Sequence, residues 1–248
     1  MAIHDFKSQR LFVEDDLTNG KTFEATREQA NYLLNVLRLK DGEQILVFNG
    51  RDGEWQVEIK ASGRKKCELR PTCQIRTQPE PYSLVYCFAP LKQARLDYMI
   101  QKAVEMGVGV LQPVITQFTQ VRTINEKRIR ANAIEAAEQC GIINLPEIRE
   151  PIKLEAIGQF VSAEATLYFC DETANQSRTS SADQASRETR NILLIGPEGG
   201  FSDEERKLID TFPNLVRLGL GPRILRADTA AIAALSIIQA QFGDWYET

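Results

Sequence analysis

The chain has 248 residues and a net charge of −4, and 43% of its residues are hydrophobic while 26% are charged. These values are ordinary for a globular protein, and they exclude a collagen, a disulfide scaffold and a largely disordered chain. The longest apolar run, residues 230–238, is too short to cross a bilayer, so we expect no membrane segment. Charged residues interrupt the N-terminal region, which argues against a signal peptide and favours a cytoplasmic protein.

Histidine and cysteine usage narrows the chemistry further. The chain has one histidine, His4, and five scattered cysteines without a Cys-x-x-Cys pair. Neither a histidine-based metal site nor a Ser-His-Asp triad is therefore expected, and we expect no metal. The cysteines indicate free thiols in a reducing compartment. Acidic residues outnumber basic ones by 34 to 30, so any nucleic-acid binding must depend on local basic patches.

Residues 1–75 show a pattern of short strands. Thr26 and Gln29 have the spacing of a capping box, which predicts a helix that ends near Leu39. Alternating apolar residues and turn dipeptides predict strands at residues 45–48, 55–59 and 65–69. Short strands separated by frequent turns predict a small β-barrel domain in this part of the chain.

Residues 76–248 instead alternate between strands and helices, after a proline-rich linker at residues 77–81. Strands are predicted at residues 84–88, 108–115, 165–170, 192–195 and 215–218. Helices are predicted at residues 96–104, 129–140 and 202–211, and from about residue 228. Polar residues 173–190 are expected to form a flexible insertion. This alternation predicts an α/β domain with a mainly parallel sheet and helices on both faces.

Two glycine-rich loops, residues 196–200 and 218–223, each follow a predicted strand. Neither is a Rossmann fingerprint or a Walker A loop. Both lie at the carboxyl ends of strands, where open α/β sheets bind ligands. Glu198 disfavours a phosphate there and favours a neutral or cationic ligand. A tight turn without a ligand is the alternative interpretation.

Arg226 stands just before the last predicted helix, whose N-cap is expected at Asp228 or Thr229. Helix N-termini favour acidic residues, so an arginine at this place is unusual. We interpret Arg226 as a cation held at a cleft for an anionic substrate, with a surface ion pair as the alternative. The small residues of the helix behind it indicate either close approach of a ligand or ordinary core packing.

The two loops together carry a family resemblance. Residues 194–205 (LIGPEGGFSDEE) and 218–230 (LGLGPRILRADTA) resemble the signature of the RsmE family of bacterial 16S ribosomal RNA uridine-N3 methyltransferases, in the SPOUT superfamily. Further similarity lies at residues 10–13, 35–38, 100–107 and 135–140. The resemblance implies a PUA-like β-barrel that binds RNA, followed by a SPOUT methyltransferase domain with a C-terminal trefoil knot. It also implies S-adenosylmethionine as the cofactor and a homodimer.

The implied activity is methyl transfer from S-adenosylmethionine to N3 of a specific uridine in 16S ribosomal RNA of the small ribosomal subunit. By similarity, the cofactor would be bound by Phe169, Cys170, Leu194, Gly196, Glu198, Gly199, Leu218, Leu220, Gly221, Leu225, Thr229 and Ala230. Since N3 must lose a proton, we expect Arg226 or Arg10 to stabilise the anionic base, and Glu198 to orient the base or take the proton. RNA contacts are expected from Arg10, Arg38, Arg51, Arg64, Lys65 and Lys66.

The sequence departs from the family pattern at three places. Residues 117–120 (QFTQ) stand where the family usually has an acidic–basic pair, Ile142 stands where an arginine is common, and Asp228 replaces a glutamate. Two other functions stay open at this point. One is an RNA-binding ribosome-assembly factor without activity, which cofactor affinity would distinguish. The other is a SPOUT methyltransferase of transfer RNA, which substrate mapping would distinguish.

Overall fold

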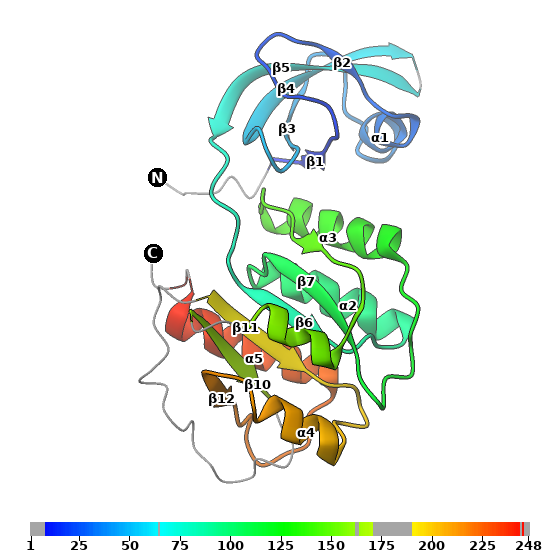
Figure 1. Ribbon diagram of the computed structural model, residues 1–248. Helices are drawn as coiled ribbons and strands as arrows, with labels where there is room; N and C mark the ends of the chain where they lie inside the picture. Colours follow the sequence, from blue (N-terminus) through cyan, green and yellow to red (C-terminus); the bar gives the residue numbers. More distant parts are fainter. Residues whose placement is uncertain (1–7, 64, 162–163, 171–189, 244, 246–248) are drawn as a thin grey trace. The chain divides into compact units, whose positions relative to one another are not determined.

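The chain divides into two compact units in the computed structural model, which describes residues 8–63, 65–161, 164–170, 190–243 and 245 (Figure 1). The first unit is Met1–Glu80 together with Ala137–Leu145, and the second is Pro81–Ala136 together with Pro146–Thr248. The expected boundary at residue 75 lies slightly before the observed one. That expectation also missed the segment Ala137–Leu145, which is tied to the first unit by a hydrogen bond from Phe12 N to Glu138 Oε1 (2.8 Å).

The first unit is built from strands, as expected, although two of them, of 10 and 11 residues, are longer than the short strands predicted. β1 pairs with β3 in parallel, while the other pairs in this sheet are antiparallel. Val57, Ile59 and Leu69 are completely buried, so the alternation read from the sequence marks the core-facing side. The sheet order is β1 (Arg10–Phe12), β3 (Gln44–Phe48), β4 (Glu54–Gly63), β5 (Lys66–Arg76) and β2 (Phe23–Glu24).

The helix of this unit begins as the sequence predicts and ends differently. Thr26 and Gln29 form both bonds of the capping box at the start of α1 (Arg27–Asn31). The chain then widens into a π-helical turn, η1 (Tyr32–Val36), and leaves the helix at Arg38, whose φ is 58°. The helix therefore ends before Leu39, because a left-handed residue cannot continue it.

The second unit contains a sheet of seven described strands, and every pair in it is parallel. Its strands are almost continuous apolar runs, which is typical of a parallel sheet covered on both faces. The order is β12 (Leu215–Arg217), β10 (Ala165–Phe169), β11 (Arg190–Ile195), β6 (Val85–Phe88), β7 (Val110–Ile115) and β8 (Glu147–Ile148), with β9 (Ile152–Lys153) also paired to β7. The expected insertion at residues 173–190 lies outside the described residues, except for Arg190, which begins β11.

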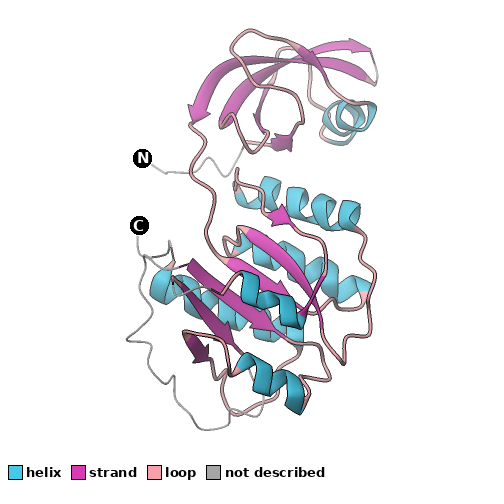
Figure 2. Cartoon of the chain, in the orientation of Figure 1, coloured by secondary structure: helices cyan, strands magenta, loops and turns pink. Residues whose placement is uncertain are grey.

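Helical segments cover both faces of this sheet, which confirms the expected layering (Figure 2). On one face, Tyr86 of β6 bonds to Met99 of α2 (Gln93–Glu105), and Tyr168 of β10 packs on Phe242 of α5 (Ala227–Phe242). The opposite face packs Leu167 among residues of η2 (Leu154–Gln159) and α4 (Asp203–Ile209). α3 (Glu126–Cys140) is joined to α2 by the Arg128–Asp97 ion pair.

None of the helices seen in the described residues combines the length and the apolar character needed to span a bilayer.

Candidate functional site

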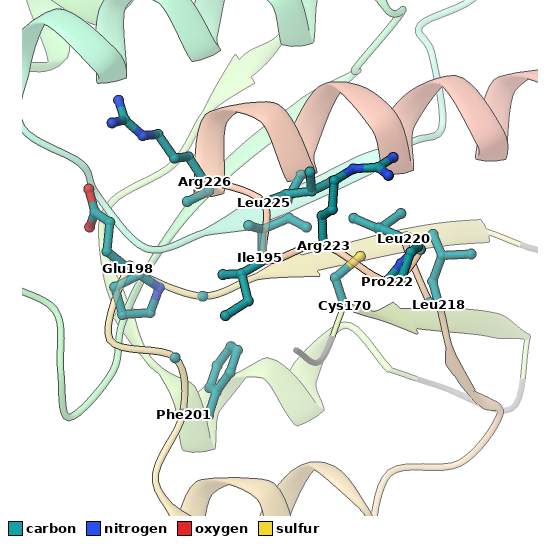
Figure 3. Close-up of a pocket in the computed structure, with 18 of the residues that line it drawn as sticks. Cys170, Ile195, Glu198, Phe201, Leu218, Leu220, Pro222, Arg223, Leu225 and Arg226 are labelled. Atoms are coloured by element: carbon teal, nitrogen blue, oxygen red, sulfur yellow. The ribbon is translucent and has the colours of Figure 1, made fainter. Parts of the chain in front are cut away.

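A pocket of about 260 Å³ opens where β10, β11 and β12 end, which is the edge at which parallel sheets bind ligands (Figure 3). Its walls come from three segments that are distant in sequence. Cys170 follows β10, Ile195 ends β11 and is followed by residues 196–198, 200 and 201, and residues 218–227 follow β12, with Arg206 and Ala230 completing the lining. The two glycine loops singled out by the sequence are therefore the main walls of one cavity.

The first glycine loop is fixed by packing and by local hydrogen bonds. A Cβ atom on Gly196 would lie 2.5 Å from the ring of Phe201, so only glycine fits there. Phe201 in turn packs edge-on against Phe169, with ring centroids 5.1 Å apart. Gly200 closes the turn by donating to Pro197 O (2.9 Å) with a φ of 66°. The loop therefore presents a preformed surface to the cavity.

The second glycine loop leaves its backbone available. Leu218 N donates to Phe169 O (2.9 Å), which anchors the start of the loop to the sheet. Within the described part of the chain, the N–H groups of Gly219, Leu220 and Gly221 donate no hydrogen bond. Gly221 has a φ of 93°, a conformation that glycine adopts without strain. This loop thus offers free main-chain donors next to leucine side chains.

Helix α5 begins earlier than predicted. Its N-cap is Arg226, with φ −68° and ψ 153°, instead of Asp228 or Thr229. Arg226 supplies no side-chain cap, and the Asp228 carboxylate accepts a bond only from the neighbouring Thr229 N (2.9 Å). The arginine caps the helix with its backbone carbonyl, which accepts from Ala230 N (2.8 Å), so its side chain is left for another role.

Glu198 and Arg226 lie at one end of the cavity, whereas Arg223 lies toward the other end. Figure 3 shows Leu218, Leu220 and Pro222 at that other end. Glu198 forms an ion pair with Arg95 of α2, with 3.0 Å between Nη1 and Oε1. The exposed Arg226 side chain forms no ion pair or hydrogen bond with any residue that the structure describes. Sequence reasoning missed Arg95, because no local signal links it to Glu198.

Most of the predicted cofactor residues line the cavity, and four do not. The four are Phe169 and Leu194, which are completely buried in the sheet, Thr229, which is exposed on α5, and Gly199. A Cβ atom on Gly199 would lie 3.0 Å from Phe118 Cβ, so this glycine is packed against a neighbouring loop. The predicted residues in the lining are Cys170, Gly196, Glu198, Leu218, Leu220, Gly221, Leu225 and Ala230. Unforeseen lining residues are Ile195, Pro197, Gly200, Phe201, Arg206, Gly219, Pro222, Arg223, Ile224 and Ala227.

Cys170 is an uncharged part of the cavity wall. Burial raises the pKa of its thiol to about 12, so the sulfur keeps its proton at neutral pH. A thiolate is the nucleophilic form of cysteine, so Cys170 cannot act as a nucleophile under these conditions. No group of three or more His, Cys, Asp and Glu side chains in the described residues is arranged to hold a metal ion.

The expectation that Arg10 is a catalytic cation is corrected. Its side chain is only 5% exposed, and Nε lies 2.9 Å from Glu54 Oε1. The second oxygen of Glu54 accepts from Arg76 Nε at 2.8 Å. Arg10 is therefore held in a buried ion-pair network of the first unit and has no free charge to offer a substrate.

The other basic residues expected to contact RNA belong to the first unit, and they differ in whether their side chains form ion pairs. Arg51 is paired with Asp16 (2.7 Å) and Lys66 with Glu24 (3.2 Å), both at the surface. Arg38 and Lys65 are exposed. Arg64 lies outside the described residues. Arg38 and Lys65 are thus the two side chains of this group that the structure shows exposed and without an ion pair to a described residue.

Comparisons with known proteins match both units. The family model for an RNA methyltransferase domain matches residues 78–239, and that for an RNA methyltransferase PUA domain matches residues 25–72. Ribosomal RNA small subunit methyltransferase E of Synechocystis is 30% identical, covering 93% of this chain and 77% of the relative. The protein of the same name from Rickettsia conorii is 28% identical, with coverages of 94% and 96%.

Solved structures agree with these matches over nearly the whole chain. A putative methyltransferase from Legionella pneumophila, in complex with its bound cofactor SAM, has a TM-score of 0.80 at 30% identity and covers 94% of this chain and 98% of its own. A ribosomal RNA small subunit methyltransferase E from Neisseria gonorrhoeae, bound to S-adenosyl methionine, has a TM-score of 0.83 at 25% identity, with coverages of 96% and 99%.

Proposed function

The chain belongs to the RNA methyltransferase domain family, and from that premise we propose that it methylates N3 of a specific uridine in 16S ribosomal RNA with S-adenosylmethionine as the methyl donor. The observation that carries the proposal is the cavity between the two glycine loops, with a carboxylate and an unpaired arginine at one end. The curated relatives are named as ribosomal RNA small subunit methyltransferases, which supports a ribosomal substrate.

The residues of the cavity suit S-adenosylmethionine. Leu218, Leu220 and Leu225 provide apolar walls for a purine ring, and the free N–H groups of residues 219–221 can bind its polar edge. Glu198 provides the carboxylate that a cationic ligand favours. When bound, the cofactor supplies an electrophilic methyl group on a sulfonium centre.

The protein's own side chains must remove the N3 proton of the uridine and stabilise the negative charge that then develops on the base. Uridine N3 carries a weakly acidic proton, and it becomes a nucleophile once that proton leaves. Glu198 is placed to orient the base or to accept this proton, and Arg95 holds the Glu198 carboxylate at the cavity edge. Arg226 supplies the positive charge that stabilises the developing anion, because its guanidinium is free of any described partner.

The first unit is proposed to bind RNA. Arg38 and Lys65 are the candidates for phosphate contacts, since their side chains are exposed. The trefoil knot that the resemblance implies stays a prediction. Acting on ribosomal RNA would place the protein in the cytoplasm.

A homodimer through the second unit is also part of the proposal. Ile224 is 87% exposed, and Ala233 and Ile237 on α5 are only partly buried. Exposed and partly buried apolar side chains of this kind are typical of a surface that a second copy covers. Light scattering should report a dimer at micromolar concentration, and a monomer would contradict this part of the proposal.

Two measurements on the purified protein test the proposed activity. Calorimetric titration should show binding of S-adenosylmethionine, whereas an inactive assembly factor with a collapsed cavity would bind none. Methyl transfer should then be measured on small ribosomal subunits and on transfer RNA in parallel. We expect transfer to 16S ribosomal RNA alone, and labelling of transfer RNA instead would favour the other methyltransferase function.

A further inference from the structure

Phe118 is an exposed aromatic residue beside the first glycine loop. It follows β7, in the segment where the sequence departs from the family pattern. Its side chain is 43% exposed, and its Cβ would lie 3.0 Å from a Cβ atom on Gly199. Gly196, Pro197, Glu198 and Gly200 line the cavity whereas Gly199 and Phe118 do not, so the phenyl ring packs on the side of this loop that faces away from the cavity.

The loop that carries Phe118 is held rigidly on either side of the ring. Thr116 and Thr119 are buried, and their hydroxyl oxygens are 2.9 Å apart. The Thr119 hydroxyl accepts from Thr116 N (2.9 Å), and Thr119 N donates to Thr116 O (3.2 Å). Gln117 N donates to Glu205 Oε1 at 2.7 Å, the same carboxylate that caps α4 through Ser202. These hydrogen bonds hold the backbone on both sides of Phe118, so the position of its ring can change little.

We propose that Phe118 stacks on an unpaired RNA base beside the first glycine loop, the neighbour of the target uridine. This inference rests on the proposed function. A uridine must leave its base pair and its stack before N3 can reach the methyl donor, and the neighbouring base then loses a stacking partner. A rigid phenyl ring beside this loop replaces that partner without reading base identity.

The test compares Phe118→Leu, which removes the aromatic face, with Phe118→Trp, which keeps it. Methyl transfer to small ribosomal subunits is measured under steady-state conditions, together with calorimetric affinity for S-adenosylmethionine. Phe118→Leu should raise KM for the subunit about tenfold with little change in kcat, whereas Phe118→Trp should stay close to wild type. S-adenosylmethionine affinity should be unchanged in both variants.

Three results would overturn the proposal. One is a wild-type KM for Phe118→Leu, and another is equal loss in both variants, which would indicate a structural role. The third is conversion of Phe118→Leu to a monomer in light scattering, which would mean that a second copy covers the ring.

If the protein transfers no methyl group to RNA, the proposed function is wrong, and the inference about Phe118 is then tested on its own. In that case, anisotropy with a fluorescent single-stranded uridine-rich oligonucleotide decides the inference. Weaker binding by Phe118→Leu than by Phe118→Trp supports it, and equal binding overturns it.

Discussion

Arg95 Nη1 lies 3.0 Å from Glu198 Oε1, and this ion pair connects the first turn of α2 to the glycine loop after β11. Both side chains are 38% exposed, so the pair contributes at most about 1 kcal/mol to stability. The main effect of this ion pair is on the position of the Glu198 side chain. Among the described residues that line the cavity, it holds the one carboxylate, on the side where Arg226 also lies.

Replacing Arg95 by alanine should therefore slow catalysis without unfolding the protein. A displaced Glu198 carboxylate would cost up to about a hundredfold in kcat, as misplaced catalytic groups do. The melting temperature should stay near wild type, because the ion pair is half-exposed. Arg95→Lys keeps the charge and should recover part of the rate. Steady-state kinetics would contradict this role if Arg95→Ala kept the wild-type kcat.

Arg226→Ala should remove the charge that stabilises the uridine anion. Loss of one preorganised group of this kind costs about 3 kcal/mol, or about a hundredfold in rate. Arg223→Ala is the matched control, because Arg223 is also exposed, lines the same cavity and lies in the same loop. Single-turnover methyl transfer should separate the two variants. Equal rates would show that Arg226 has no special part in the reaction.

Gly196→Ala should distort the wall of the cavity. The added Cβ would meet the Phe201 ring at 2.5 Å, and overpacking of this kind costs about 1 to 3 kcal/mol. Since Phe201 lines the cavity, calorimetry should show weaker binding of S-adenosylmethionine. Gly158→Ala is the control, because Gly158 does not line the cavity and its Cβ would make only an ordinary contact of 3.5 Å with Phe212. Normal cofactor affinity in Gly196→Ala would contradict the site.

Arg10→Ala should affect stability rather than chemistry. Removing one partner of a buried ion pair costs about 3 to 5 kcal/mol, because Glu54 would keep a buried charge with less compensation. The matched variant Arg51→Ala breaks a surface pair and should cost less than about 1 kcal/mol. Urea denaturation measures both values. Similar costs for the two variants would argue against the buried network.

The capping boxes show which parts of the fold are readable from local sequence. Thr26 with Gln29, and Ser202 with Glu205, satisfy helix N-termini within four residues, so their spacing alone predicts where each helix begins. The apolar strands of the second unit were readable for a similar reason, since their composition follows from burial on both faces. The π-helical turn before Arg38 left no such signal.

The ion pairs of the charged residues could not be predicted from the sequence. Arg95 and Glu198 are 103 residues apart, and only the packing of α2 against the sheet brings them together. Arg10 and Glu54 are 44 residues apart, so the sequence alone does not show that Arg10 is a structural partner of Glu54. Glycine positions were readable as loops, but whether Gly199 faces the cavity or Phe118 depends on tertiary contacts.

The central claim is tested most directly by mapping the product. Small ribosomal subunits from a strain that lacks this protein should be incubated with the purified protein and S-adenosylmethionine. The 16S ribosomal RNA is then digested, and its nucleosides and fragments are analysed by mass spectrometry. The account predicts 3-methyluridine at one position, formed by the wild type and strongly reduced with Arg226→Ala. A methyl group found on a ribose oxygen, or no new methyl group in 16S ribosomal RNA, would contradict it.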